Sequence, residues 1–473
     1  MAAVRTVYVV SDLHLGGEPE EGRRGFRICT HENDLATFIS SLGGRQDHPS
    51  ELVLNGDTFD FLAEKVSDKQ PFWADFRGTE QAGLKCLNTI AEDRCPGVIQ
   101  ALRAHLEQGH RLVILPGNHD IELSLPAVRG RLRELVAPRG CDYEFVGNGE
   151  AYRVGDVVIE HGDRIDDMNF VDYNLLRRHC GHLSRGMAVQ PENAFDPPAG
   201  SKLVATVING IKTTYRFIDL LKPEKEAAFP VILALEPGRR GALRNIARAY
   251  REGKRRRKEQ LKQYSSDISA RPGSEPTPPA VDQTDELGDI LQRTLGRRDF
   301  ALSEPADESA GVADISALDK AKSFATLLFG SKKEGWDQRL YDLLDALRAF
   351  QSGDAFRRDR ETEPGYEKAA RDLAYGPLRH VVFGHTHMAR QIAIPSGGFY
   401  FNSGTWADVL RLPPNILAMD KTYAPLAELE QFVRELVEND FSRFTTMFKP
   451  VFVRFRQDEN GNSTEAALCD YDG

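Results

Sequence analysis

The sequence contains few cysteines and no long apolar run, and both shortages exclude classes of protein. The six cysteines stand at positions 29, 86, 95, 141, 180 and 469 and form no C-x-x-C pair, so neither a disulfide framework nor a four-cysteine zinc site is expected. Apolar stretches such as Val231–Leu235 are far too short to cross a bilayer. Thr6–Val10 has the composition of a buried strand where a secretory signal would carry its apolar core. We therefore expect a cytoplasmic protein that is neither secreted nor membrane-spanning.

The chain also lacks an excess of positive charge. Its 473 residues include 61 Lys and Arg against 71 Asp and Glu, a net charge of −10. This balance argues against nucleic-acid binding over the whole surface, although a local basic patch is compatible with it. Hydrophobic residues at 41% and charged residues at 28% are typical of a folded chain. The length predicts two or three domains, or one large α/β body with insertions.

Short apolar segments alternate with amphipathic ones over the first third of the chain. Glu32–Leu42 and Val98–Leu106 have helical spacing, and β-branched runs of four or five residues between such segments predict buried strands. The predicted strands are Thr6–Val10, Glu51–Leu54, Leu112–Leu115, Asp156–Glu160, His380–Phe383, Phe399–Phe401 and Pro450–Phe455. Strand–helix alternation of this kind predicts an α/β sandwich.

The middle of the chain has a different character. Apolar residues at three- and four-residue steps predict an amphipathic helix over Val204–Leu221, and residues 239–262 carry eleven Lys and Arg against two Glu. Residues 265–316 are rich in Pro, Ser, Asp and Glu, which predicts a flexible linker, and helical patterns resume at 318–328 and 336–350. We therefore predict a core in two parts, 1–165 and 378–473, separated by a mainly helical insertion, 166–377.

Five of the predicted strands end in a short polar segment that contains Asp, Asn or His. Four of these five polar segments also contain a glycine, which permits a tight turn. The segments are Ser11-Asp12-Leu13-His14, Asn55-Gly56-Asp57-Thr58-Phe59-Asp60, Gly117-Asn118-His119-Asp120, Glu160-His161-Gly162-Asp163 and Gly384-His385-Thr386-His387. Polar groups on open α/β sheets collect at the carboxyl ends of strands, so these segments are expected to converge.

Carboxylates, imidazoles and one amide form a mixed oxygen and nitrogen ligand set, which suits Mn, Fe or Zn better than Mg or Ca. Seven candidate ligands would crowd one cation, whereas two cations that share the carboxylate of Asp57 would have four each. The candidate ligands are Asp12, His14, Asp57, Asn118, His161, His385 and His387. Two-metal sites of this kind act on phosphorus and hold their ions roughly 3.5–4 Å apart.

Neighbouring residues are candidates for other roles. His119 follows Asn118 and could act as the general acid for a leaving alkoxide, with Asp60 as the carboxylate that orients it. Asp163 and Arg164 follow His161 and are candidates for contact with substrate, although support of His161 is the expected role of Asp163.

The five segments together resemble the calcineurin-like metallophosphoesterase superfamily, whose blocks are D-x-H, G-D-x-x-D, G-N-H-[DE], H and G-H-x-H. The resemblance covers roughly residues 6–165 and 378–405, with Asn402-Ser-Gly-Thr-Trp406 as a further matching strand end. It implies a four-layer sandwich of two mixed sheets flanked by helices. Carried over by position, it implies one metal on Asp12, His14, Asp57 and His387, and a second on Asp57, Asn118, His161 and His385. It also implies in-line attack by a hydroxide that bridges two metals, most simply Mn, with His119 as the acid.

Within the superfamily, Ser11-Asp-Leu-His-Leu15 and His161-Gly-Asp163 resemble the branch of UDP-2,3-diacylglucosamine diphosphatases, which has Arg where this chain has His119. The substrate class therefore stays broad: a phosphodiester or diphosphate, either a small molecule or lipid-linked. A nuclease of the same superfamily is an alternative, and residues 239–262 could bind nucleic acid or the surface of a membrane. A non-catalytic metal-binding scaffold is the second alternative, disfavoured by the complete ligand set.

Overall fold

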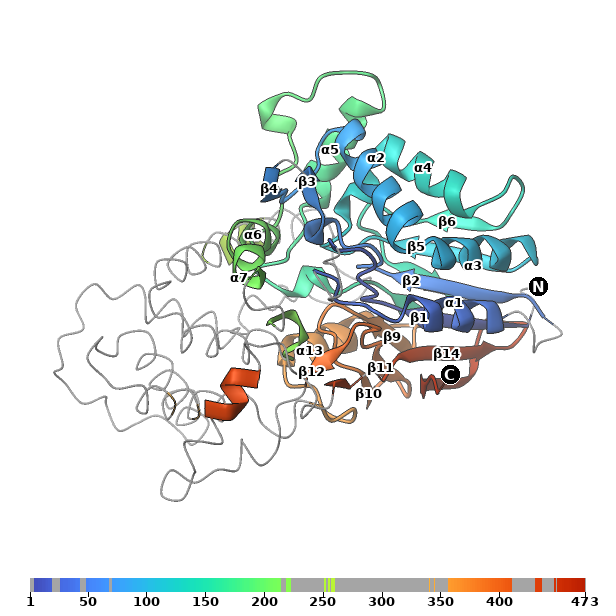
Figure 1. Ribbon diagram of the computed structural model, residues 1–473. Coiled ribbons are helices and arrows are strands. Elements are labelled where there is room, and N and C mark those ends of the chain that lie inside the picture. Colours follow the sequence, from blue (N-terminus) through green and yellow to red (C-terminus); the bar gives the residue numbers. More distant parts are fainter. Residues whose placement is uncertain are drawn as a thin grey trace. The chain divides into compact units, whose positions relative to one another are not determined.

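The computed structural model describes most of both predicted core parts and a fraction of the chain between them (Figure 1). The described residues are 4–18, 26–42, 48–67, 70–213, 218–222, 251, 254–255, 257–259, 340, 344, 356–410, 430–435, 446–447 and 449–472. The chain forms two compact units, of which the first comprises Met1–Asn209, Phe356–Asp408 and Phe448–Gly473 and the second Gly210–Ala355 and Val409–Met447. All residues of the five polar segments belong to the first unit.

The first unit contains a six-stranded mixed sheet in the order β15-β14-β1-β2-β5-β6. Its strands are β1 (Arg5–Val10), β2 (Ser50–Asn55), β5 (Arg111–Leu115), β6 (Tyr143–Phe145), β14 (Val451–Gln457) and β15 (Ser463–Asp470). The four strands β1, β2, β5 and β6 are parallel, whereas β14 pairs antiparallel with both β1 and β15. The carboxyl ends of β1, β2 and β5 therefore lie at one edge of this sheet.

A second, five-stranded mixed sheet has the order β10-β11-β9-β8-β7. Its strands are β7 (Tyr152–Val154), β8 (Val157–Ile159), β9 (His380–Phe383), β10 (Arg390–Ala393) and β11 (Phe399–Asn402). The central strands β8, β9 and β11 are parallel, and the outer strands β7 and β10 run antiparallel to their neighbours. Two polar segments, those after β8 and β9, thus leave the same edge of this sheet.

One apolar cluster joins the two sheets, because it contains side chains from both. Its fully buried members include Val7 and Val9 of β1, Val382 of β9 and Phe401 of β11. Successive side chains of a strand point to opposite faces, so Tyr8 and Val10 of β1 belong to a different cluster on the outer face of the first sheet. The alternation along β1 thus places one set of side chains between the sheets and the other beneath helices.

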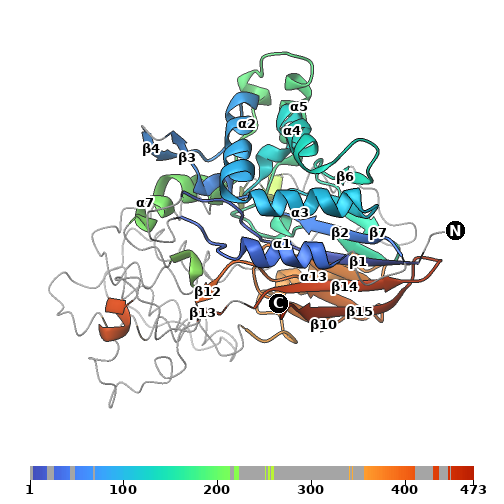
Figure 2. The ribbon, with the colours of Figure 1, turned by 45° about the vertical axis from the view of Figure 1, so that its right-hand side comes forward.

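Helices cover the outer faces of both sheets (Figure 2). Four contribute to the cluster on the first sheet, namely α1 (Glu32–Ser41), α2 (Glu80–Asn88), α3 (Pro96–Glu107) and α4 (Pro126–Val136). On the second sheet, Tyr366 and Ala370 of α13 (Pro364–Leu373) pack against Val381 and Tyr400. Proline is the first residue of α3, α4 and α13, where its missing N–H costs no helical hydrogen bond. The observed architecture is therefore an α/β sandwich of two mixed sheets.

The predicted strands are confirmed, with bounds that shift by up to two residues. Glu32–Leu42 and Val98–Leu106 are also helical, as α1 and α3. The single helix predicted over Val204–Leu221 is only partly correct. Helix α6 (Ala199–Leu203) continues through a π-helical segment, Val204–Ile208, into α7 (Asn209–Lys212), and a separate 3₁₀ turn spans Ile218–Leu220. The π-helical segment changes the angular register on which the prediction depended.

Other predictions for the middle of the chain lie largely outside the described residues. Residues 265–316 and 318–328 are not described, and only Leu340 and Leu344 of 336–350 are. Six residues of the basic segment 239–262 are described, among them Arg255 and Glu259, which form an ion pair one helical turn apart. The division into 1–165, 166–377 and 378–473 stays a prediction.

The helix α5 and two small sheets are further elements of the described residues. The helix α5 (Tyr173–Leu183) begins at Asp172, whose side chain accepts a hydrogen bond from the backbone N–H of Leu175. Two small two-stranded sheets complete the list: β3 (Lys65–Ser67) with β4 (Gln70–Trp73), and β12 (Val409–Leu410) with β13 (Thr446–Met447). Among the helices of the described ranges, none combines the length and the apolar character that a membrane crossing needs.

The core between the sheets gives a test of this architecture. Phe401→Ala should lower the free energy of unfolding by about 3–5 kcal/mol. The ring is fully buried against Phe455, and its removal would leave a cavity that the neighbouring side chains fill only in part. Phe72→Ala is the control, since that ring on β4 is 50% exposed and its loss should change stability by less than about 0.5 kcal/mol. Urea denaturation measures both, and equal effects of the two substitutions would contradict the sandwich.

Candidate metal centre

The candidate ligands lie at strand ends where the backbone has an unusual conformation. Among the described residues, five that are not glycine have positive φ angles, between 45° and 68°. They are Asp12, His14, Asp57, His385 and His387, all of them candidate ligands. Such left-handed conformations cost of order 1–3 kcal/mol each and persist only where the surroundings enforce them. The strain therefore falls on the residues whose side chains must converge.

Hydrogen bonds between the segments hold these bends in place. The carboxylate of Asp12 accepts the backbone N–H of His385 at 2.9 and 3.1 Å, which ties the end of β1 to the end of β9. The Oδ1 atom of Asp57 accepts the backbone N–H of His119 at 2.8 Å, which ties the end of β2 to the end of β5. Each carboxylate is thus fixed by a segment from a distant part of the chain.

Asp12, His14 and His387 form a first cluster with the composition of a metal site. One potential ligand atom from each lies within 4.8 Å of the others. The Nε2 atoms of His14 and His387 are 3.0 Å apart, and Nε2 of His387 is 3.3 Å from Oδ1 of Asp12. Two imidazole nitrogens that both present lone pairs would repel each other at this distance. A shared proton or a cation must therefore lie between them.

Asp57, His161 and His385 form the second cluster. The Nδ1 atom of His161 donates to the backbone carbonyl of Asn55 at 2.9 Å, so that nitrogen carries the proton of the neutral ring. Its Nε2 is then an acceptor, yet it faces the carboxylate Oδ2 of Asp57 at 3.3 Å. His385 uses Nε2 for a contact of 3.1 Å with Asp166, while its buried Nδ1 has no hydrogen-bond partner in the described part of the structure. A proton or a metal cation would therefore be needed between Nε2 of His161 and the carboxylate of Asp57.

Asp57 lies between the two clusters. The same Oδ2 atom that faces His161 is 3.9 Å from Nε2 of His14, and the carboxylate is almost fully buried. Asn118 adds a further unsatisfied acceptor, because its side-chain oxygen is buried and has no hydrogen-bond partner among the described residues. Buried acceptors without donors are costly in a folded protein. The buried His and Asp groups could bind a metal ion, and the donor set fits such an ion.

His119 and Asp60 are placed together at the side of these clusters. The Nδ1 atom of His119 is 3.1 Å from Oδ1 of Asp60, and His119 is the more exposed of the pair, at 20% of its side chain. Asp60 also lies 3.5 Å from Nδ1 of His14. His14, Asp60 and His119 are a third group with metal-site composition. Because Asp60 lies between both rings, it can orient His119 and His14 at once.

The charges at these positions are strongly coupled. Burial raises the pKa of Asp12, but the positive potential of His387 and His161 outweighs burial and lowers that pKa to about 2. Burial likewise opposes ionisation of Asp57, yet the adjacent His161 and His119 hold its pKa well below the usual range. For His161, burial lowers the pKa and the carboxylate of Asp57 raises it well above the ordinary value. The downward pKa shifts of both carboxylates therefore depend on the positive charge of neighbouring imidazoles.

Two aspartates support the site in ways that the sequence did not indicate. Asp166 accepts a hydrogen bond from the side chain of Asn169 and contacts Nε2 of His385. It thereby fixes the imidazole ring of His385, whose buried Nδ1 atom has no hydrogen-bond partner among the described residues. Asp120 accepts the backbone N–H groups of Gly117, Thr58 and Phe59, which joins the segments after β2 and β5. Only the position of Asp120 beside His119 was visible in the sequence. The contact of Asp166 with His385 crosses 219 residues and no local pattern signals it.

The two candidates for substrate contact differ in their surroundings. Asp163 is buried, and its Oδ2 has no hydrogen-bond partner within the described residues. Arg164 forms an ion pair with Glu160, four residues earlier in the chain, so its charge is already engaged. Contact with substrate stays a prediction for both.

The metal-binding role of the clusters can be tested by thermal denaturation. Added Mn²⁺ should raise the melting temperature, because a ligand that binds only the folded state stabilises it, and EDTA should remove the effect. Asp57→Asn should weaken Mn²⁺ binding by at least about 10–100-fold. A loss of that size is typical when a residue that only hydrogen-bonds a metal ligand is mutated, and loss of a ligand itself should cost no less. Asp156→Asn is the matched control, since Asp156 is equally buried but precedes β8, at the other end of that strand. A metal response that survives Asp57→Asn would exclude Asp57 as a ligand.

Gly117 gives a second test, which leaves every candidate ligand unchanged. A Cβ atom at this position would lie 2.2 Å from Oδ1 and 2.6 Å from the backbone nitrogen of Asp57, so Gly117→Ala must displace that aspartate. We expect Gly117→Ala to weaken Mn²⁺ binding in calorimetry about tenfold or more. Gly97→Ala, where a Cβ atom meets nothing within 4 Å, should bind as the parent does. Equal affinities of the two variants would show that the position of Asp57 is not critical.

Comparison of the sequence with known proteins gave no match, neither to a family model nor to a curated protein. The resemblance to metallophosphoesterases therefore rests on the five motif segments alone. The case for a function rests on the geometry that those segments adopt in this fold.

Proposed function

We propose that the protein is a metal-dependent phosphoester hydrolase that uses two divalent cations. The observation that carries the proposal is the buried carboxylate of Asp57, which lies between two clusters of His and Asp whose acceptor atoms face one another. Two mixed sheets with helices on both outer faces are compatible with the four-layer metallophosphoesterase sandwich. Mn is the cation we favour, with Fe or Zn as alternatives for this mixed ligand set.

In this proposal the two clusters hold one cation each and share Asp57. Asp12, His14 and His387 would hold the first, while His161, His385 and Asn118 would hold the second. When bound, such a pair of cations supplies Lewis-acid stabilisation of phosphoryl oxygens and a water nucleophile that is deprotonated near neutral pH. The lowered pKa values of Asp12 and Asp57 support this assignment, because a metal ligand must be deprotonated.

His119 would act on the leaving group. Its ring is partly exposed, and Asp60 accepts from Nδ1 at 3.1 Å, which leaves Nε2 as the atom that can carry a proton towards an alkoxide. Asp60 also accepts the backbone N–H of Ala63, so its own position is fixed. A buried carboxylate that orients an imidazole in this way stabilises the protonated ring that general-acid catalysis needs.

The substrate is proposed to be a phosphodiester or a diphosphate, of a small molecule or of a lipid-linked compound. An alkoxide leaving group needs protonation, which gives His119 its role, and an alkyl phosphodiester supplies such a group. No contact among the described residues bears on the nuclease alternative, because most of the basic segment that would bind nucleic acid, residues 239–262, lies outside them. A non-catalytic scaffold would not need His119 and Asp60 beside the metal clusters, and this pair favours an enzyme.

Turnover of simple substrates tests the proposal. We expect Mn-loaded protein to hydrolyse a bis-aryl phosphodiester faster than an aryl phosphomonoester, and EDTA to abolish turnover. Asp57→Asn should reduce kcat to background while circular dichroism shows an intact fold, whereas Asp156→Asn should stay active. Absence of turnover on diesters, diphosphates and oligonucleotides, in protein that elemental analysis shows to be metal-loaded, would favour the scaffold alternative.

The role of His119 predicts a dependence on the leaving group. His119→Ala should lower kcat about 10²–10⁴-fold for diesters with an alkyl leaving group, because general-acid catalysis contributes an effect of that size. The loss should be much smaller for a nitrophenyl leaving group, which departs without protonation. Kinetics over a series of leaving groups measures the difference. A uniform loss across the series would contradict acid catalysis and indicate a structural role.

A further inference from the structure

The outer face of α5 carries a concentration of positive charge that the proposed reaction does not use. Between Asp172 and Glu192 the chain contains three arginines and two histidines but no acidic residue, in a protein whose net charge is −10. Arg177, Arg178 and Arg185 are all exposed. A local excess of this kind produces a positive potential that attracts anions.

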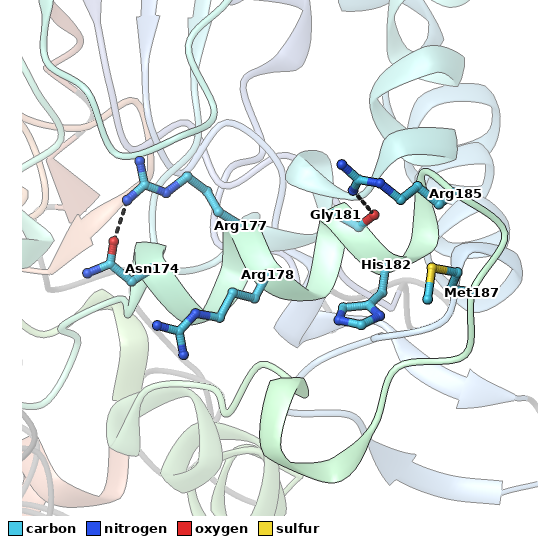
Figure 3. A pocket seen from close by; sticks show the side chains of 7 residues that line it. All are labelled: Asn174, Arg177, Arg178, Gly181, His182, Arg185 and Met187. Atoms are coloured by element: carbon cyan, nitrogen blue, oxygen red, sulfur yellow. Dashed lines mark hydrogen bonds between the residues drawn. The ribbon is translucent and has the colours of Figure 1, made fainter.

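These residues line a solvent-open pocket of about 580 Å³. Its lining residues are Asn174, Arg177, Arg178, Gly181, His182, Arg185 and Met187. Figure 3 shows that they come from successive turns of α5 and from the segment just after it. Gly181 has no side chain, and Nη1 of Arg185 lies 3.3 Å from the position that a Cβ atom of residue 181 would occupy.

In the described part of the chain, no acidic side chain forms an ion pair with an arginine of this pocket. None of the described residues that line it is acidic, and Arg178 and Arg185 form no ion pair in the part of the chain that the structure describes. Arg177 and Arg185 instead donate to neutral acceptors, Oδ1 of Asn174 and, at 2.6 Å, the carbonyl of Gly181 (Figure 3). These bonds hold the guanidinium groups without cancelling their charge.

The opposite face of α5 is firmly anchored, which fixes the positions of the arginines. Tyr173 and Leu176 are buried in a cluster with Ile121 and Phe195. His179 makes two hydrogen bonds across the helix boundary, one with the carbonyl of Gly78 and one from the backbone N–H of Phe195, both 3.0 Å. The pocket therefore stands on a rigid support, and an anion bound there would lose little energy to ordering the helix.

We propose that the basic face of α5 is a binding site for the phosphate group of a phosphorylated ligand. Guanidinium groups bind phosphate oxygens with two parallel hydrogen bonds, and the pocket offers three of them: Arg177 and Arg178 on one turn of α5, and Arg185 just after the helix. The phosphate belongs either to a free small molecule or to the headgroup of a phospholipid. The site shares no residue with the metal centre, so it is independent of the proposed hydrolysis.

The test compares two pairs of arginines in the full-length protein, with EDTA present so that metal ions do not contribute. Arg178→Gln with Arg185→Gln removes two charges from the pocket. Arg103→Gln with Arg371→Gln removes two exposed charges that are each already paired with a glutamate one turn away. The probes are inorganic phosphate, followed by calorimetry, and vesicles of phosphatidylcholine with or without phosphatidylglycerol, followed by sedimentation.

We expect saturable binding of at least one probe, weakened about tenfold or more by the pocket variant and unchanged by the control. Binding of inorganic phosphate assigns the site to free phosphorylated ligands, and binding of the anionic vesicles alone assigns it to a lipid headgroup. Two results would overturn the proposal: no saturable binding of either probe at low salt, or equal weakening by both variants. Neither depends on whether the metal centre is catalytic.

Discussion

The site depends on one constraint: hydrogen-bond acceptors that face one another at buried strand ends need a proton or a cation between them. His161 presents Nε2 to Asp57, and His14 presents Nε2 to His387. A neutral N–H of one ring could satisfy the contact between His14 and His387, whereas the contact between His161 and Asp57 would need a charged imidazole in a buried site. Two divalent cations would satisfy them together and would also engage the buried side-chain oxygen of Asn118. The buried clusters could therefore bind metal ions, and the surrounding fold holds their acceptor atoms close together.

The fold meets that constraint by directing strands of two sheets towards one place. The carboxyl ends of β1, β2 and β5 in one sheet and of β8 and β9 in the other supply every candidate ligand. Left-handed backbone at five of the ligands turns their side chains inward, and glycines leave the space they need. Gly56 is an example, because a Cβ atom there would lie 2.3 Å from Nδ1 of His161. The backbone strain is offset by hydrogen bonds such as those from His385 to Asp12.

Much of this arrangement could be predicted from the sequence, since it depends on local patterns. Strands such as His380–Phe383 are short, apolar and followed at once by His or Asp, so both the strand and its polar end are visible in one stretch of residues. Contacts between distant segments were not visible. The contact of Asp166 with His385 and the three backbone contacts of Asp120 depend on how loops meet in space. The helix expected over Val204–Leu221 was only partly correct for a local reason, because apolar spacing does not reveal a π-helical segment.

Anomalous X-ray diffraction from crystals grown with Mn²⁺ would locate the two cations that we propose Asp57 to share. We expect two anomalous peaks on either side of the Asp57 carboxylate, roughly 3.5–4 Å apart as in other two-metal sites. One peak should lie among Asp12, His14 and His387, and the other beside His161 and His385. A single peak, or peaks that lie away from Asp57, would contradict the account.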